Sequence, residues 1–154
     1  MALADCQILG NPEMLSTIRL DIREAEVIYL YAFKVQGEFF SDLFSGHIDK
    51  RKIYVVANHS EERILKILSK EFVNLHAATW SKNRMWHSKV YIFPSRGIAY
   101  VGSHNLTLYA FTSGINHSIR IQDGAQVDRL CKEFWRAYKI AQEVSPYDPQ
   151  DLIV

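Results

Sequence analysis

The chain has 154 residues, of which 48% are hydrophobic and 23% charged, and it contains seven Gly and four Pro. These values are typical of one globular domain and exclude a disordered, collagen-like or coiled-coil protein. Eighteen Lys and Arg residues balance seventeen Asp and Glu residues to a formal net charge of +1, so the bulk charge does not by itself indicate a polyanionic partner.

The first half of the chain alternates helix and strand patterns. Apolar residues at helical spacing predict a helix that begins at Pro12 and runs to about Glu24. The next run is β-branched and aromatic without polar alternation, which predicts a strand buried on both faces. The elements predicted after the first helix are a strand at Val27–Phe33, a short helix or turn at Gly37–His47, a strand at Lys52–Ala57 and a helix with Ser60 as its N-cap residue.

The second half is richer in strands. Its predicted elements are strands at Val73–Trp80, Trp86–Phe93, Ile98–Ser103 and Ser118–Ile121, and a helix from Gly124 that ends before Pro146. Because helix and strand alternation gives way to hairpin spacing, we predict an α/β fold in which helices sandwich a mixed β-sheet. No repeat or linker interrupts the pattern, so residues 1–154 are predicted to form a single domain.

Cysteine usage and apolar runs indicate the compartment. Cys6 and Cys131 are far apart in the sequence, and a chain of this length folds without a disulfide, which favours a reducing compartment. Met1–Gly10 lacks the basic and long apolar segments of a secretory signal. The longest apolar run, Val27–Phe33, is far shorter than the roughly 20 residues that span a bilayer. We therefore predict a soluble cytoplasmic protein with no membrane partner.

The charges are unevenly distributed along the chain. All seventeen acidic residues lie outside Phe72–Gln122, a stretch that we call the cationic segment. Four of the six histidines lie within it, as do five basic residues: Lys82, Arg84, Lys89, Arg96 and Arg120. We expect the functional site in this segment.

Two pairs of side chains in the cationic segment point to phosphate chemistry. His87 and Lys89 are two residues apart in a predicted strand, so both leave the same face of the sheet. Ser103 and Asn105 share a face in the same way, and the preceding Gly102 has no side chain to obstruct a ligand. If the two strands pair, the patch binds an anion, and its histidine can attack a phosphoryl centre. The segment has no acid or cysteine to hold a metal, so we predict no metal site and no cofactor.

These residues resemble a known signature. His87-Ser88-Lys89, followed by Gly102-Ser103-His104-Asn105, is similar to the HxK…GSxN motif of the phospholipase D superfamily, and especially of its small single-motif nucleases. The resemblance extends over roughly residues 25–121, where the helices and strands fall in the family's order. It implies a phospholipase D-like half-domain fold.

The resemblance also implies a reaction. His87 would attack phosphorus to form a phosphohistidine, while the histidine of a second motif protonates the leaving oxygen and later activates water. Lys89, Ser103 and Asn105 would hold the phosphate oxygens and stabilise their charge. Because the reaction needs two motifs and this chain carries one, the resemblance implies a homodimer in which two copies of His87 flank one phosphodiester.

The sequence departs from the family pattern at two positions. Pro94 stands where many members have an Asp five residues after the motif Lys, although restriction-enzyme-like members also lack it. Ser118 stands where members usually place a Glu that orients the active-site histidine, so we expect either that His117 or another residue compensates or that activity is reduced. The residues that we assign to substrate binding are Lys82, Arg84, Gly102, His117 and Ser118.

Several other side chains have two interpretations. Trp80 and Trp86 flank Lys82 and Arg84, an arrangement that either stacks bases and pairs with phosphates or packs in the core. We expect Tyr29, Tyr31 and Phe33, like the set Phe39, Phe40 and Phe44, to belong to the core or to a dimer interface. The histidines that we expect to be hydrogen-bonded or on the surface, without an acid–base role, are His76, His104 and His117.

The leading hypothesis is a metal-independent endonuclease that cleaves nucleic acid, DNA more readily than RNA, as a homodimer with one composite site. Phospholipid hydrolysis or transfer by the same chemistry is one alternative. A nucleic-acid-binding module that has lost catalysis is another, suggested by Ser118 in the place of a Glu. The sequence contains no helix-turn-helix or zinc finger, so we expect any cleavage to be weakly sequence-specific.

Overall fold

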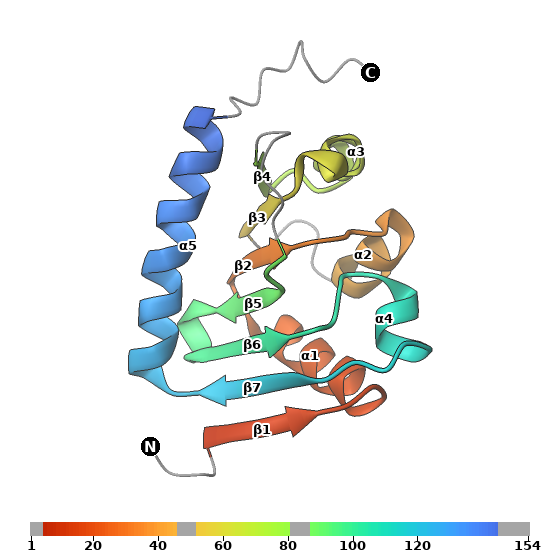
Figure 1. The fold of residues 1–154 in the computed structure, drawn as a ribbon, viewed down its shortest axis with the longest axis vertical. Helices are drawn as coiled ribbons and strands as arrows, with labels where there is room; N and C mark the ends of the chain where they lie inside the picture. The colour runs from red at the N-terminus through yellow and green to blue at the C-terminus, as the bar shows by residue number, and fades with distance from the viewer. Residues whose placement is uncertain (1–4, 46–51, 81–86, 145–154) are drawn as a thin grey trace.

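The computed structural model describes residues 5–45, 52–80 and 87–144. Strands and helices alternate along most of this length, and one long helix ends it (Figure 1). The elements in chain order are β1 (Cys6–Leu9), α1 (Glu13–Glu24), β2 (Val27–Ala32), α2 (Gly37–Phe44), β3 (Lys52–Ala57), the 3₁₀ turn η3 (His59–Glu61), α3 (Glu62–Glu71), β4 (Leu75–Thr79), β5 (Val90–Phe93), the 3₁₀ turn η4 (Pro94–Arg96), β6 (Ile98–Gly102), α4 (Leu108–Thr112), β7 (Ser118–Gln122) and α5 (Gly124–Val144).

The seven strands of the described residues form one mixed sheet in the order β1-β7-β6-β5-β2-β3-β4. The pairs β2·β3 and β3·β4 are parallel, whereas β5 pairs antiparallel with β2 and joins the antiparallel strands β6, β7 and β1. Because of these directions, β1, β2, β3, β4 and β6 finish at the end of the sheet where β5 and β7 begin. We call this end the site end.

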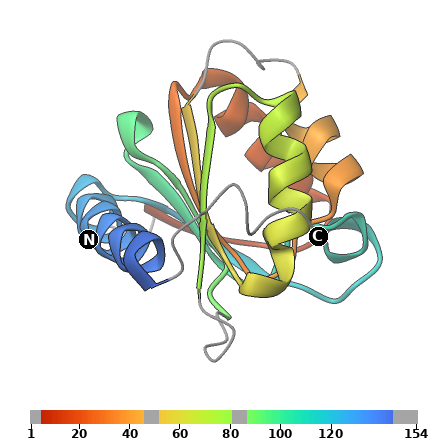
Figure 2. The same ribbon diagram turned by 90° about the horizontal axis from the view of Figure 1, so that it is seen from above.

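Helices cover both faces of the sheet. Figure 2 shows α5 on one face and the other helices on the opposite face. The larger core packs the sheet against α1, α2 and α3, and it includes the phenylalanines of α2. The smaller core packs α5 against the sheet through Phe134 and Tyr138, with Trp80 buried among them. The prediction of a mixed sheet sandwiched by helices is confirmed, and Trp80 belongs to the core.

The structure differs from the predicted elements at four places. Strand β1 and the one-and-a-half-turn helix α4 were not predicted, because each is too short to show a periodic pattern. The prediction of Ser60 as an N-cap is wrong, since η3 carries that residue and α3 begins at Glu62 without a side-chain cap. Strand β5 begins at Val90 rather than Trp86.

A buried ion pair joins α1 to β6 and β7, the two strands that meet at the site end. Asp21 of α1 is buried and accepts hydrogen bonds from Arg120 Nε at 2.9 Å and Nη2 at 3.2 Å, and from the hydroxyl of Tyr100. Burial and the Asp21 carboxylate raise the pKa of Tyr100 far above its ordinary value, so this hydroxyl stays protonated. The network joins neighbouring residues of β6 and β7, since Tyr100 pairs with Arg120 in the ladder.

Candidate active site at one end of the sheet

The residues predicted to act on phosphate gather at the site end. Lys89 and His87 precede β5, Ser103 and Asn105 follow β6, and His117 precedes β7. The β5·β6 ladder is continued by a hydrogen bond of 3.2 Å from Gly102 N to Lys89 O. The parallel strands also direct their carboxyl ends here, which is where ligands bind in open α/β sheets.

His87 and Lys89 meet on the ring of Phe33, the residue that follows β2. The exposed imidazole of His87 stacks on this ring with centroids 4.6 Å apart and an interplanar angle of 21°. Lys89 Nζ lies 4.9 Å from the same centroid and donates a 2.9 Å hydrogen bond to the backbone oxygen of His87. The two residues lie outside β5, so strand alternation does not bring them together. Their shared contact with Phe33 does.

Ser103 is bound to the backbone of His117. Its hydroxyl accepts from His117 N at 3.1 Å and donates to His117 O at 3.2 Å, and Ser103 N donates to the same oxygen at 3.0 Å. Both residues are exposed. The hydroxyl hydrogen must therefore rotate away from His117 O before Ser103 can donate to a phosphate oxygen.

Asn105 carries an unpaired polar atom. The residue is half-buried, and its Oδ1 is buried without a hydrogen-bond partner in the described part of the chain. Leaving such an atom unpaired costs about 1–3 kcal/mol. The backbone around it is fixed, because Leu106 N donates to Lys34 O at 3.1 Å and Leu106 O accepts from Gln36 N at 2.9 Å. The backbone bonds of Leu106 thus hold Asn105 in place at the site end.

Gly102 and Ser118 have structural roles that the sequence did not indicate. A Cβ on Gly102 would lie 2.5 Å from both Cα and Oγ of Ser118 and would also collide with His117 O. The glycine thus permits the close approach of β7, and this packing accounts for it without a ligand. Ser118 is 3% exposed, and its hydroxyl bonds the buried imidazole of His104 rather than His87. The assignment of Ser118 to substrate binding is corrected accordingly, because its side chain is covered.

The packing at Gly102 gives a testable expectation. Replacing Gly102 by Ala should lower the free energy of unfolding by about 1–3 kcal/mol, because β7 must move to admit the new methyl group. Urea unfolding followed by circular dichroism measures this. Gly124→Ala is the matched control, since no atom lies within 4 Å of a Cβ built there. Equal stability of the two variants would contradict the steric role of Gly102.

Other residues considered from the sequence lie either outside the described part of the chain or away from the site end. Lys82, Arg84 and Trp86 lie outside the described residues. His76 is exposed on β4 and stacks on Tyr54 at 4.9 Å, as expected for a surface histidine. Within residues 5–45, 52–80 and 87–144 no group of three or more His, Cys, Asp or Glu side chains could hold a metal ion, and no helix is long and apolar enough to cross a membrane.

The structure adds two residues to the site end that sequence reasoning missed. Phe33 was expected in the core or a dimer interface, yet it contacts His87 and Lys89. Glu61 accepts a 3.1 Å hydrogen bond from Val35 N, and burial raises the pKa of its carboxyl group. Its position after β3 was the available signal, since the carboxyl ends of parallel strands share an edge.

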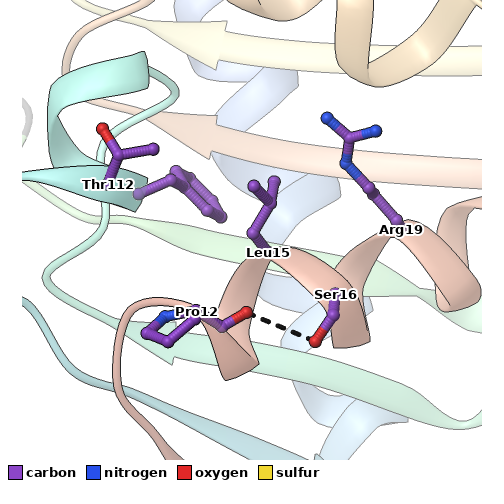
Figure 3. Close-up of a pocket in the computed structure, with 6 residues that line it drawn as sticks. Pro12, Leu15, Ser16, Arg19 and Thr112 are labelled. Carbon is purple, nitrogen blue, oxygen red and sulfur yellow. Dashed lines mark hydrogen bonds between the residues drawn. The ribbon is translucent and has the colours of Figure 1, made fainter.

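A separate cavity of about 450 Å³ lies between α1 and α4. Figure 3 shows the residues that line it: Pro12, Leu15, Ser16, Arg19, Phe111 and Thr112. The Ser16 hydroxyl donates to Pro12 O at 3.3 Å, and the guanidinium group of Arg19 pairs with Asp42 at 3.0 Å. None of the predicted phosphate-binding residues lines it, so it is distinct from the candidate active site.

No family model and no curated protein matches the sequence. Solved structures match at the level of the fold. NucT from Helicobacter pylori has a TM-score of 0.71 and 14% identity over 90% of this chain and 96% of its own. Nuc from Salmonella typhimurium, a phospholipase D family member, has a TM-score of 0.74 and 14% identity over 87% and 93% of the two chains.

A larger protein shares the same fold. The phosphatidylserine synthase of Haemophilus influenzae Rd KW20 has a TM-score of 0.71 and 12% identity, over 86% of this chain and 36% of the synthase. The predicted resemblance is therefore confirmed at the level of the fold, which this chain shares with a phospholipase D family member.

Proposed function

We propose that this chain, which shares its fold with nuclease and phospholipid-synthase members of the phospholipase D superfamily, is a metal-independent phosphodiesterase that cleaves nucleic acid, with DNA as the expected substrate. One observation carries the proposal. The His87 imidazole is exposed beside the Lys89 ammonium group at the sheet end where Ser103 and Asn105 stand. Cleavage of DNA in excess EDTA by the wild type, and its loss in His87→Ala, is the decisive experiment.

The first step uses His87 as a nucleophile. A neutral ring nitrogen attacks phosphorus, the P–N bond forms, and the bond from phosphorus to the leaving oxygen breaks. That oxygen takes a proton from the second histidine. Lys89 and the side-chain donors of Ser103 and Asn105 stabilise the negative charge on the remaining phosphate oxygens. The cations and donors are all side chains, so this step needs no metal.

Water completes the reaction in the second step. The second histidine, now neutral, removes a proton from water, whose oxygen attacks phosphorus. The P–N bond breaks and returns its electron pair to His87, so the phosphate monoester leaves and the enzyme is restored. Phe33 keeps the His87 ring in one plane through both steps, because the stacked rings resist tilting.

A second copy of the chain would supply the second histidine. The segment from Asn105 to His117 starts and finishes at the site end, and it exposes three large apolar side chains. Their exposures are 52% for Leu108, 69% for Tyr109 and 94% for Ile115. We expect this apolar group to pack against the partner subunit, since burying it stabilises a dimer and brings the two sites together.

A charge at the apolar group tests the dimer. Ile115→Glu should convert the dimer to a monomer at micromolar concentration and reduce DNA cleavage in parallel, because a carboxylate would be desolvated in the interface. Light scattering gives the mass. Val73→Glu is the matched control, since Val73 is 72% exposed at the opposite end of the sheet. A wild-type monomer, or an Ile115→Glu dimer with full activity, would contradict this assignment.

Phospholipid hydrolysis or transfer is the second enzymatic candidate, and the shared fold of the phosphatidylserine synthase favours it. The same His87 chemistry would act on a lipid phosphodiester. Release of headgroup from phosphatidylglycerol or phosphatidylserine vesicles, faster than cleavage of DNA, would select this alternative.

A binding module without catalysis is the candidate from another functional class. It is favoured by Ser118, which provides no carboxylate and whose hydroxyl bonds His104. Salt-sensitive DNA binding without turnover, equal in the wild type and His87→Ala, would select it.

A further inference from the structure

His104 lies between the two candidate phosphate-binding residues Ser103 and Asn105, and its side chain is completely buried. A histidine with no solvent contact has to satisfy both ring nitrogens inside the protein. Its hydrogen bonds therefore show what the middle position of the Gly102–Asn105 segment does.

The two ring nitrogens of His104 contact two different segments. Nε2 lies 2.8 Å from Asn11 Oδ1, and Nδ1 lies 2.7 Å from Ser118 Oγ. The amide of Asn11 is oriented by its Nδ2, which donates to the carbonyl oxygen of Gly114. Because Asn11 Oδ1 can only accept, Nε2 carries the proton and Nδ1 accepts from the Ser118 hydroxyl. The contacts thus select one neutral tautomer.

The backbone and ring of His104 are held as well. The hydroxyl of Tyr91, on β5, donates to His104 O. The imidazole packs against Phe111 of α4 with centroids 5.0 Å apart. One residue is thus tied to the β1–α1 connection, β5, α4 and β7 at once. These contacts fix the backbone position between Ser103 and Asn105.

We propose that His104 is a positioning residue that, through its bonds to Asn11 and Ser118, holds Ser103 and Asn105 in the geometry that binds phosphate. That Ser103 and Asn105 bind phosphate rests on the proposed function, whereas the hydrogen bonds from His104 to Asn11 and Ser118 are part of the structure. His104 touches no substrate. The Ser118 hydroxyl bonds His104 and not His87, which explains why a hydroxyl stands at that position.

The charge state of His104 agrees with this role. Burial, together with a smaller effect of the neighbouring His117, lowers its pKa to about 4, so the ring is neutral at physiological pH. His117 is the titratable group that acts on it. Its other polar neighbours are the Asn11 amide and the hydroxyls of Tyr91 and Ser118.

Variants at His104 separate positioning from packing. His104→Phe keeps a ring against Phe111 but removes both hydrogen bonds, whereas His104→Gln keeps an amide that can bond Asn11. We expect His104→Phe to lower kcat for cleavage of a labelled DNA duplex in EDTA by about a hundredfold, the effect of an ångström-scale displacement of catalytic groups. His104→Gln should recover kcat to within about threefold of the wild type, and KM should change little in either variant.

The comparison has a control and two contrary outcomes. His76→Gln should match the wild type, because His76 is exposed on β4 and far from these bonds in the fold. Unchanged kcat in His104→Phe would overturn the proposal. So would equal losses in the Phe and Gln variants, since the hydrogen bonds would then be irrelevant. If His104→Phe does not fold, Asn11→Ala and Ser118→Ala replace it, and wild-type kcat in both would overturn the proposal.

A binding measurement keeps this proposal separate from the nuclease proposal. In the wild type, titration with inorganic phosphate should shift the backbone amide signals of Ser103 and Asn105 in NMR spectra, and His104→Phe should weaken these shifts. A wild type that shows the shifts but cleaves no DNA would refute the nuclease and leave the positioning role supported. Shifts of equal size and affinity in both proteins would refute the positioning role.

Discussion

Replacing His87 by Ala should reduce DNA cleavage by at least about a thousandfold, because the substitution removes the nucleophile that forms the P–N bond. Lys89, Ser103 and Asn105 remain, so binding of the phosphate should be affected far less than turnover. The measurement is the rate of cleavage of a labelled DNA duplex in excess EDTA, with enzyme in excess over substrate.

The control for His87 must be another exposed histidine that stacks on an aromatic ring. His76 meets both conditions, since its ring lies 4.9 Å from that of Tyr54 on the neighbouring strand. His76→Ala should cleave at the wild-type rate. Equal cleavage by the wild type and His87→Ala, or no cleavage by the wild type under any condition, would contradict the nuclease proposal.

Mixed dimers test the composite site more sharply. If both copies of His87 serve one phosphodiester, a dimer with one wild-type and one His87→Ala subunit has no activity. Mixing equal amounts of the two chains and allowing exchange should then leave about one quarter of the dimers active, as expected for random pairing. Independent sites in each subunit would instead leave about three quarters of the dimers with at least one active site and about one half of the wild-type activity, which would contradict the shared site.

The fold was predictable where the signal is local. The apolar runs around Ile28 and Val55 have no polar alternation because helices cover both faces of the central strands, and both residues are indeed buried. The Pro94–Gly97 turn was predictable for a similar reason, since it joins β5 to β6 at Gly97 in a left-handed conformation, with φ at 62°. Strand β1 has four residues and an exposed Ile8, so it has no pattern apart from its pairing with β7.

The candidate site was predictable in its residue types but not in its contacts. The HxK and GSxN spacings identify His87 and Asn105 as candidate site residues from their sequence neighbours alone. The contact of Phe33 with His87 joins residues 54 positions apart, and its only sequence signal is the end of a strand. The bond from His104 to Asn11 spans 93 positions. Such contacts depend on the order of strands in the sheet, which periodicity does not show.

Acid should destabilise the protein through His104. The folded-state pKa of about 4 lies below the ordinary value of 6.5, so between these values the folded state binds fewer protons than the unfolded state. The stabilisation is therefore complete above pH 6.5 and is lost as the pH falls toward 4. At 1.36 kcal/mol for each pKa unit, the loss is about 3 kcal/mol, a large part of the free energy of unfolding of a small domain.

Urea unfolding of the wild type and His104→Gln at several pH values between 7.5 and 4 isolates this contribution. The rest of the sequence is the same in both proteins, so its effects cancel in the difference. At neutral pH the Gln variant should be the less stable protein, because it keeps one of the two hydrogen bonds. Toward pH 4 the difference in the free energy of unfolding should shrink or change sign, a change of about 3 kcal/mol, since Gln has no proton to gain.

His76→Gln is the control, since it removes an exposed imidazole. Its free energy of unfolding should depend on pH as that of the wild type does. A pH-independent difference in the free energy of unfolding between the wild type and His104→Gln would mean that the pKa of the buried ring is not lowered. That outcome would contradict the neutral tautomer inferred from its contacts with Asn11 and Ser118.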